Sequence, residues 1–197
     1  MIKEFFKYAL PSALAMFVSS LYTIIDGIFV GQGVGDSALA AVNIVMPFTI
    51  MLFGIATMFA VGGGDLVSKS IGANNKEKAV KIFRQVFKFL LILSIVISLF
   101  AVIFSKYIVK ILGATDTLVP LASTYLRYYS LFCIPNLVGI ALNSFVRNDG
   151  RPKLAMVSTL SGAITNIILD YVFIFPLGFG IKGAAIGTVI CQLINFI

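Results

Sequence analysis

The sequence predicts an all-α integral membrane protein, a bundle of six transmembrane helices. Hydrophobic residues make up 59% of the 197 residues, charged residues only 12%, and the mean hydropathy is +1.04. Such values lie far above the apolar content of an ordinary soluble domain. Long apolar runs also alternate with short stretches that carry charges, glycine or proline. Because about 20 apolar residues suffice to cross the hydrocarbon layer, these runs are candidate spans.

The first expected span covers residues 8–30, behind a short basic leader. Pro11 lies in its first turns, where proline removes one backbone hydrogen bond and either starts or bends the helix. Residues 13–15 look like a signal-peptide cleavage site, but the apolar stretch before them is too short, so we expect the span to be retained. Residues 31–36 are glycine-rich and are expected to form a turn.

The other expected spans are separated by polar segments. The glycines at 62–64 and the polar residues at 68–78 are expected to form a loop, and Pro135 a soft break. The last apolar run has only fifteen residues, which is short of a full crossing and predicts that the chain is a fragment. The remaining spans are expected at residues 38–61, 89–105, 128–146, 154–175 and 183–197.

The placement of lysine and arginine predicts the orientation of the bundle. If successive loops lie on opposite sides, eleven cations share the side of the N terminus, three lie on the other side, and Arg127 is ambiguous. The positive-inside rule then predicts a multi-pass protein of the cell (cytoplasmic) membrane with a cytoplasmic N terminus. These cations lie between apolar runs, so the net charge of +7 does not predict a nucleic-acid partner.

The sequence lacks the residues that metal binding and acid–base catalysis usually require. The chain has no histidine, the commonest metal ligand and general base. Cys133 and Cys191 both fall inside apolar runs, where a buried, reduced pair is expected, and no Cys/His metal spacing exists. We therefore expect neither an enzyme nor a bound cofactor.

Two acids fall deep inside expected spans, and they define the candidate site. Asp26 and Asp170 are the only such acids, and Asn166 lies one helical turn before Asp170. A carboxylate in hydrocarbon is costly unless it is neutral, paired or beside a wet cavity. An all-oxygen set of this kind suits a hard cation such as sodium, or two carboxyls that share a proton.

Other interpretations of these residues are available. The acids could instead be bonded by hydroxyls and amides of neighbouring helices and serve only to hold the bundle together. Residues 62–65 also match the Gly-x-Gly-Asp signature of intramembrane aspartyl proteases, with Asp26 as partner acid, but Ile25 stands where the usual tyrosine would precede that acid.

Three segments together resemble the multidrug and toxic-compound extrusion (MATE) transporters. Residues 11–31 resemble the first helix of that family, residues 143–153 the loop after its fourth helix, and residues 166–188 its fifth and sixth helices. The resemblance implies a fold of twelve helices in two six-helix lobes, of which residues 1–197 would be the amino-terminal lobe. Asp65 departs from it, because a neutral residue is expected there.

The resemblance also implies a site and a function. Asp26, Asn166, Asp170 and Thr188 match the residues that bind the coupling ion, Na+ or H+, and Pro11 matches a proline linked to helix bending. The implied function is cation-coupled export of amphipathic, often cationic organic compounds by a protein that needs membrane lipid and a carboxy-terminal lobe. A flippase for lipid-linked precursors and a structural membrane module without transport are the alternatives.

Overall fold

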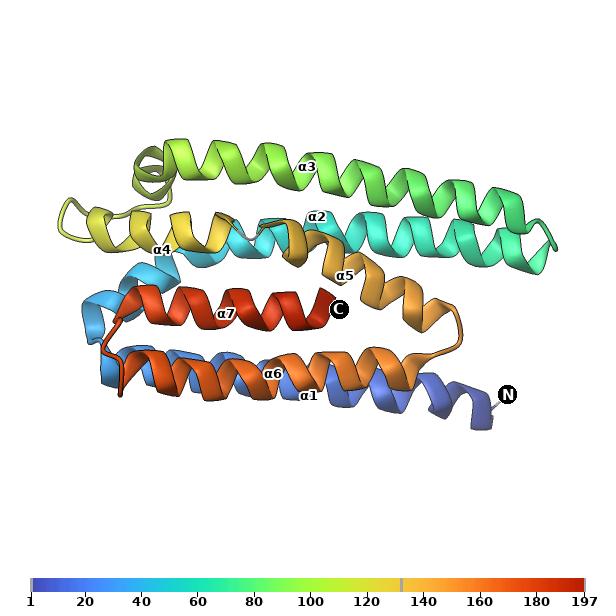
Figure 1. Cartoon of the computed structure of the whole chain (residues 1–197), viewed down its shortest axis with the longest axis horizontal. Helices are drawn as coiled ribbons and strands as arrows, with labels where there is room; N and C mark the ends of the chain where they lie inside the picture. Colours follow the sequence, from blue (N-terminus) through green and yellow to red (C-terminus); the bar gives the residue numbers. More distant parts are fainter. Residues whose placement is uncertain (1, 132, 197) are drawn as a thin grey trace.

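A computed structural model describes residues 2–131 and 133–196, and these ranges are entirely helical apart from short connections (Figure 1). The seven helices are α1 (Ile2–Gly33), α2 (Asp36–Gly72), α3 (Lys76–Ile111), α4 (Val119–Leu131), α5 (Cys133–Asn148), α6 (Pro152–Ile174) and α7 (Ile181–Phe196).

Most of these helices meet the requirements for crossing a membrane. Within the described residues, α1, α2, α3 and α6 are each long and apolar enough to span it. The pair α4 and α5 is bent by 54° and passes the same test when counted as one broken span. Helix α7 is apolar but has only 16 residues. The chain is therefore a helical membrane protein with four spans of sufficient length, or five with the bent pair.

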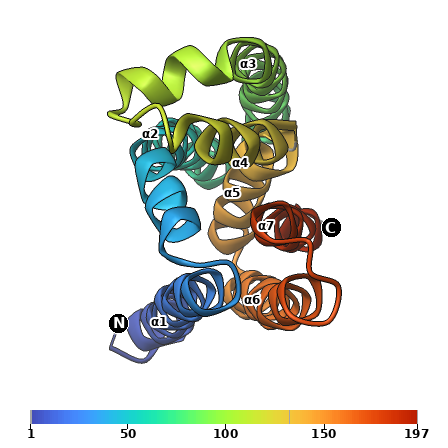
Figure 2. The ribbon, with the colours of Figure 1, turned by 90° about the vertical axis from the view of Figure 1, so that its left-hand side faces the viewer.

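Most of the helices run along one common direction in an elongated bundle, while the beginning of α2 and the end of α3, beyond a kink at Phe104, turn away from it (Figures 1 and 2). Helix α6 packs against α1 and α7, whereas α3 packs against α2, α4 and α5 on the opposite side of the bundle. The core between them consists mainly of small and branched apolar side chains, among them Val45, Leu52, Leu126, Leu137 and Ala185. The N terminus lies at the same end as the α2–α3 and α5–α6 turns (Figure 1).

The glycines at 62–64 do not form the expected loop, and that prediction was wrong. Helix α2 continues through them to Gly72, so only residues 73–75 connect it to α3. A Cβ atom at Gly63 would approach Val86 Cγ2 to 2.8 Å, and one at Gly64 would collide with the Asn148 amide. These glycines therefore allow close packing of α2 on α3 and α5, while intrahelical hydrogen bonds satisfy the backbone.

The turn between α1 and α2 is also shorter than expected. Helix α1 extends to Gly33, and only Val34 and Gly35 separate it from α2. Gly35 has a φ of 110°, which side chains on an L-residue strongly disfavour, so glycine is needed at this position.

Two further helices begin earlier than the apolar pattern indicates. Helix α3 starts at Lys76, where the side chain of Asn75 accepts a hydrogen bond from the Lys78 N–H at 3.0 Å and caps the helix. Helix α4 starts at Val119 rather than near residue 128. The charged first turn of α3 carries little apolar signal, and α4 begins with the short apolar stretch 119–122 followed by polar residues, although both backbones are helical.

Candidate functional site

The two deep acids meet where α1 packs against α6. The carboxyl groups of Asp26 on α1 and Asp170 on α6 face each other, and the amide of Asn166 adjoins Asp170. Asp170 is 0% exposed and Asn166 is 1% exposed, whereas Asp26 is half-buried. The sequence spacing of four residues places Asn166 and Asp170 on one face of α6, and that face is directed at α1.

Several buried side-chain atoms of these three residues make no hydrogen bond. Seven buried side-chain N and O atoms in the described residues have no hydrogen-bond partner, and five of them belong to Asp26, Asn166 and Asp170. A buried polar group that makes no hydrogen bond costs on the order of 1–3 kcal/mol, and a charged one costs more. The buried atoms of this cluster therefore need a partner that the described side chains do not supply.

Helix α7 closes the site through its backbone. A Cβ atom at Gly187 would collide with Asp170 Oδ1, so the α7 main chain lies directly against this carboxyl group. The next residue, Thr188, is half-buried, and its Oγ1 donates a hydrogen bond to the Ala184 carbonyl at 3.0 Å. The lone pairs of this hydroxyl oxygen can still accept a hydrogen bond or contact a cation.

The structure brings two tyrosines to the site that the sequence patterns did not single out. Tyr125 on α4 adjoins the Thr188 hydroxyl and lies near both carboxyl groups, and Tyr22 on α1 lies near the same acids. Tyr22 precedes Asp26 by one helical turn, so helical spacing could have found it. Tyr125 had no such signal, because only the packing of α4 against α7 brings it there.

Pro11, the other predicted functional residue, lies away from the acids. It is buried within α1, and the helix continues through it without interruption. The four predicted ligands Asp26, Asn166, Asp170 and Thr188 thus lie together, and Pro11 is in the amino-terminal third of the same helix as Asp26.

Asp65 takes no part in this site, and the protease interpretation is wrong. Its carboxylate pairs with Lys69 at 2.8 Å, one turn away on the exposed surface of α2. At 1.5 Å per residue it lies about 44 Å along α2 from Asp36, while Asp26 lies only about 10 Å before the end of α1. The two aspartates are therefore near opposite ends of the bundle and do not form a catalytic pair.

The donor set favours small, hard cations. The described residues contain no group of three or more His, Cys, Asp or Glu side chains that could hold a metal ion. Neutral oxygens such as those of Asn166 and Thr188 would therefore have to complete a cation site around the two carboxylates. Carboxylate, amide and hydroxyl oxygens suit sodium, and two facing carboxyls also suit a shared proton.

A comparison with protein families decides where the chain belongs. The model of the family described as MatE matches residues 11–172, which includes most of α1 and nearly all of α6. The chain belongs to the MatE family. The matched range contains Asp26, Asn166 and Asp170, so the three residues with unpartnered atoms lie within the part shared with other MatE proteins.

Similar proteins and structures are consistent with this assignment to MatE. The multidrug export protein MepA of Staphylococcus saprophyticus is 28% identical over 193 residues, which are 98% of this chain and 43% of that protein. A MATE crystal structure in complex with MaD3S is 30% identical, has a TM-score of 0.89, and is matched over 96% of this chain and 42% of that one.

A second similar structure belongs to a transporter for which a different function has been suggested. It is a transporter of the MOP superfamily from Pyrococcus furiosus, 29% identical, with a TM-score of 0.89 over 96% of this chain and 42% of that one. Its description states that the reverse polarity of its binding pocket suggests a different function. The chain spans less than half the length of these relatives and corresponds to their amino-terminal half.

Proposed function

We propose that this chain is the ion-binding lobe of an antiporter that exports amphipathic, often cationic organic compounds in exchange for Na+ or H+. Support for export comes from the MatE family match and from relatives named as multidrug export proteins. Support for ion coupling comes from one observation, the five unpartnered buried atoms of Asp26, Asn166 and Asp170. A protein that only needed a stable bundle would gain from apolar residues there.

The proposed coupling follows from the chemistry of the two carboxyl groups. Without a proton or a cation, Asp26 and Asp170 repel each other in a low-dielectric interior. A bound Na+ contacted by Asn166 and Thr188 oxygens, or a proton shared by the acids, removes this repulsion and draws α1, α6 and α7 together. Only an ion that binds one arrangement of the helices better than the other can shift the equilibrium between them.

Pro11 is proposed as the position at which α1 changes shape during this cycle. Proline removes one backbone hydrogen bond, so a helix bends more easily at that residue. Because Pro11 and Asp26 share α1, binding of an ion at Asp26 and bending at Pro11 would be mechanically linked. The export path itself would need a second lobe, since the chain matches less than half of its transporter relatives.

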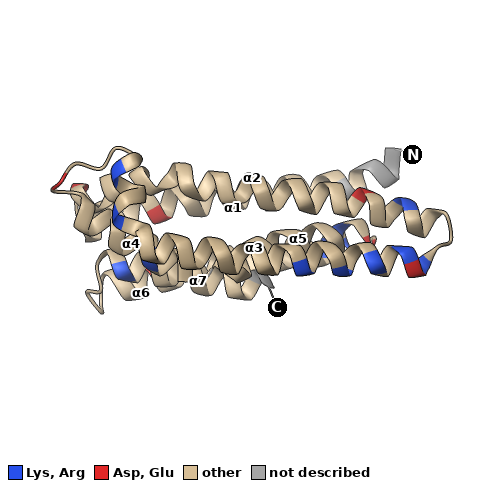
Figure 3. Cartoon of the chain, turned by 90° about the horizontal axis from the view of Figure 1, so that it is seen from above, with Lys and Arg blue, Asp and Glu red and all other residues tan. Residues whose placement is uncertain are grey.

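The proposed orientation places the N terminus in the cytoplasm. Lysine and arginine residues gather at the bundle end where α1 begins and where the α2–α3 turn lies, as Figure 3 shows. The positive-inside rule assigns the more cationic end to the cytoplasm. Asp26 lies nearer the other end, so the coupling ion would enter the site from the outer side.

A flippase for lipid-linked precursors is the second candidate, and one comparison indicates that a protein with this fold can have a function other than drug export. The MOP transporter from Pyrococcus furiosus shares this fold, yet its binding pocket suggests a different function. An anionic lipid-linked cargo would call for cations inside the lobe. Arg127 on α4, however, is exposed and donates a hydrogen bond from Nε to Ser105 Oγ at 2.7 Å. This position favours drug export over the flippase.

The deciding experiment measures efflux of a fluorescent cationic dye from cells that express the full-length gene containing this chain. Wild type, Asp26→Asn and Asp170→Asn would be compared while sodium and pH are varied separately. We expect both variants to lose ion-driven efflux, and the ion that supports wild-type efflux identifies the driving cation. Asp116→Asn, which alters an exposed acid, is the matched control. Unchanged efflux in both variants would favour a purely structural role for the deep acids.

A further inference from the structure

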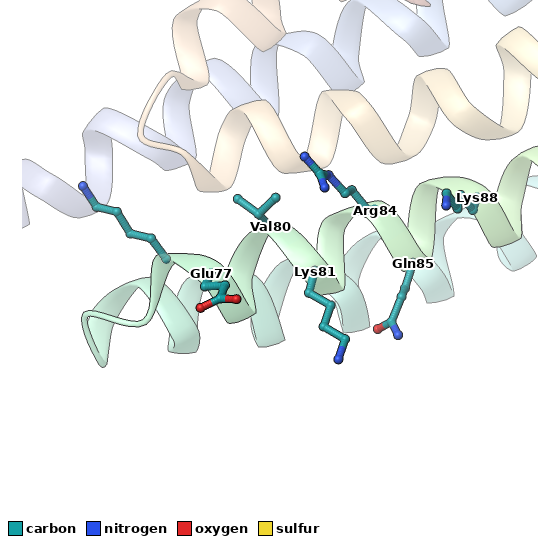
Figure 4. A pocket seen from close by; sticks show the side chains of 7 residues that line it. Glu77, Val80, Lys81, Arg84, Gln85 and Lys88 are labelled. Carbon is teal, nitrogen blue, oxygen red and sulfur yellow. The ribbon is translucent and has the colours of Figure 1, made fainter.

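The first turns of α3 form an unusually cationic surface. Five cations lie within thirteen residues there, and they share this stretch with a single acid, Glu77. All five are exposed, and most of them line an open groove of about 660 Å³ (Figure 4). We call this stretch the α3 basic surface; its cations are Lys76, Lys78, Lys81, Arg84 and Lys88.

The cations of the α3 basic surface are not neutralised by the described residues. None of the five forms an ion pair with a described acid, although other cations of the chain do. Lys69, for example, pairs with Asp65 at 2.8 Å, and Lys110 pairs with Asp116 at 3.1 Å. The surface thus keeps a charge of about +4 that is available to a partner.

The α3 basic surface continues directly into an apolar face of the same helix. Lys81 and Lys88 are two turns apart, and helical spacing places the exposed side chains of Ile92, Ile95 and Leu99 on the same stripe. From Lys88 to the kink of α3 at Phe104 the helix carries no further charge over about 24 Å, which is most of the roughly 30 Å thickness of hydrocarbon, and charge returns just beyond the kink at Lys106. Lys88 therefore lies where the membrane interior meets the head-group layer.

The side chains are suited to that layer. Figure 4 shows Arg84 and Val80 on one side of α3 and Lys81 and Gln85 on the other, so charge is presented on both flanks of the helix. Long lysine and arginine stems can lie along apolar surface while the charged group reaches phosphate. Helix α3 also lies across the bundle from α1 and α6, so this surface is separate from the ion site.

We propose that the α3 basic surface is a docking site for the head groups of anionic phospholipids in the leaflet at the end where α1 begins. Clusters of four to eight lysines and arginines next to a transmembrane helix are suited to such lipids, which carry the complementary charge. A soluble anion or a nucleic acid would not account for the position of Lys88 at the membrane boundary. The proposal does not depend on what the protein transports.

The test uses the full-length protein that contains this chain, purified in detergent and titrated with phosphatidylglycerol or phosphatidylcholine, with bound lipids counted by native mass spectrometry. We expect wild type to prefer phosphatidylglycerol. The triple variant Lys81→Gln, Arg84→Gln, Lys88→Gln should bind it on the order of 100-fold more weakly, because each interfacial cation contributes roughly one factor of five. Phosphatidylcholine binding should not change.

The matched control neutralises three cations at the other end, with Lys106→Gln, Lys110→Gln and Lys182→Gln. It should keep the preference for phosphatidylglycerol. Equal loss in both triple variants, or no loss in either, would overturn the proposal. A measurement on wild type alone guards against misfolding of a variant: phosphatidylglycerol affinity should fall steeply with added salt and resist an equal concentration of inorganic phosphate. A salt-independent affinity, or displacement by phosphate, would contradict a lipid docking site.

Discussion

Two acids in the interior of the bundle and three acids at its ends lie in opposite surroundings. At the ends, Asp65, Asp116 and Asp149 are exposed, and each pairs with a lysine or arginine at 2.8 to 3.7 Å. In the interior, Asp26 and Asp170 face each other with unpartnered oxygens. A lysine or arginine side chain paired with an acid remains part of the protein. An acid without such a partner could instead pair with a free cation that binds and dissociates. In the proposed function the two interior acids bind an exchangeable ion, whereas the exposed pairs add only a little stability.

The largest effect on ion-driven efflux is expected when the interior acids are given a lysine partner, as the exposed acids have. Asn166→Lys would place an ammonium group beside Asp170 on the buried face of α6, where it takes the place of the exchangeable ion. We expect ion-driven dye efflux to fall to the level of cells without the gene. The assay is the same efflux measurement, with membrane abundance checked by immunoblot. Thr117→Lys adds the same charge at an exposed position and should leave efflux intact. Full efflux in Asn166→Lys would show that the acids do not carry the coupling ion.

A smaller change would move one acid without altering any charge. In Gly187→Ala, the new methyl group would collide with Asp170 Oδ1 and push the carboxyl group away from its neighbours. Overpacking of this kind costs about 1–3 kcal/mol, so the ion concentration for half-maximal efflux should rise about tenfold or more. Gly27→Ala is the control, because a Cβ there meets no atom within 4 Å although it lies next to Asp26. Equal behaviour of the two variants would argue against the close approach of α7.

The hydroxyl of Tyr125 should matter less than either acid. Tyr125→Phe removes the group that adjoins Thr188 and leaves the ring in the core. Loss of one hydrogen bond costs about 0.5–1.5 kcal/mol, which corresponds to a few-fold to about tenfold weaker ion binding in the efflux titration. Tyr107→Phe, at an exposed tyrosine of α3, should change nothing. An unaltered titration in Tyr125→Phe would remove this tyrosine from the site.

The smallest effect is expected at an exposed pair. Asp65→Asn breaks the contact with Lys69, and such surface pairs are worth about 1 kcal/mol or less. We expect unchanged ion dependence of efflux and a shift of the melting temperature of the purified protein by no more than about 2 °C. Loss of ion coupling in this variant would erase the distinction between interior and exposed acids.

Much of the candidate site could be predicted from the sequence, because a carboxyl group inside the hydrocarbon layer is costly and such residues usually have a function. Asp26 and Asp170 stand out in apolar runs, and Asn166 follows from helical spacing. Tyr125 does not stand out, because an aromatic residue in an apolar helix is ordinary, and its place near the acids depends on how α4 packs against α7. The contact of Gly187 with Asp170 could not be predicted from the sequence either, because the need for glycine is evident only when the neighbouring carboxyl group is located.

The fold was predictable in class but not in its boundaries. Composition and run length indicate a helical membrane bundle, and the structure has long apolar helices. Glycines at 62–64 look like a turn because glycine disfavours helices in water. In a bundle that lies in lipid, backbone hydrogen bonding outweighs this preference, so α2 continues through all three glycines, and Gly63 and Gly64 pack closely against neighbouring side chains.

The site joins helices that lie far apart in the sequence, and this has a consequence for biosynthesis. Asp26 belongs to the first helix, but Asp170 follows only after about 140 further residues have been made. At roughly 5–20 residues per second, the first helix waits about 7–30 seconds for its partner. During that time an acid in the nascent helix faces lipid or the insertion machinery alone, which favours its uncharged form. The candidate site is therefore complete only once α6 and α7 have been made.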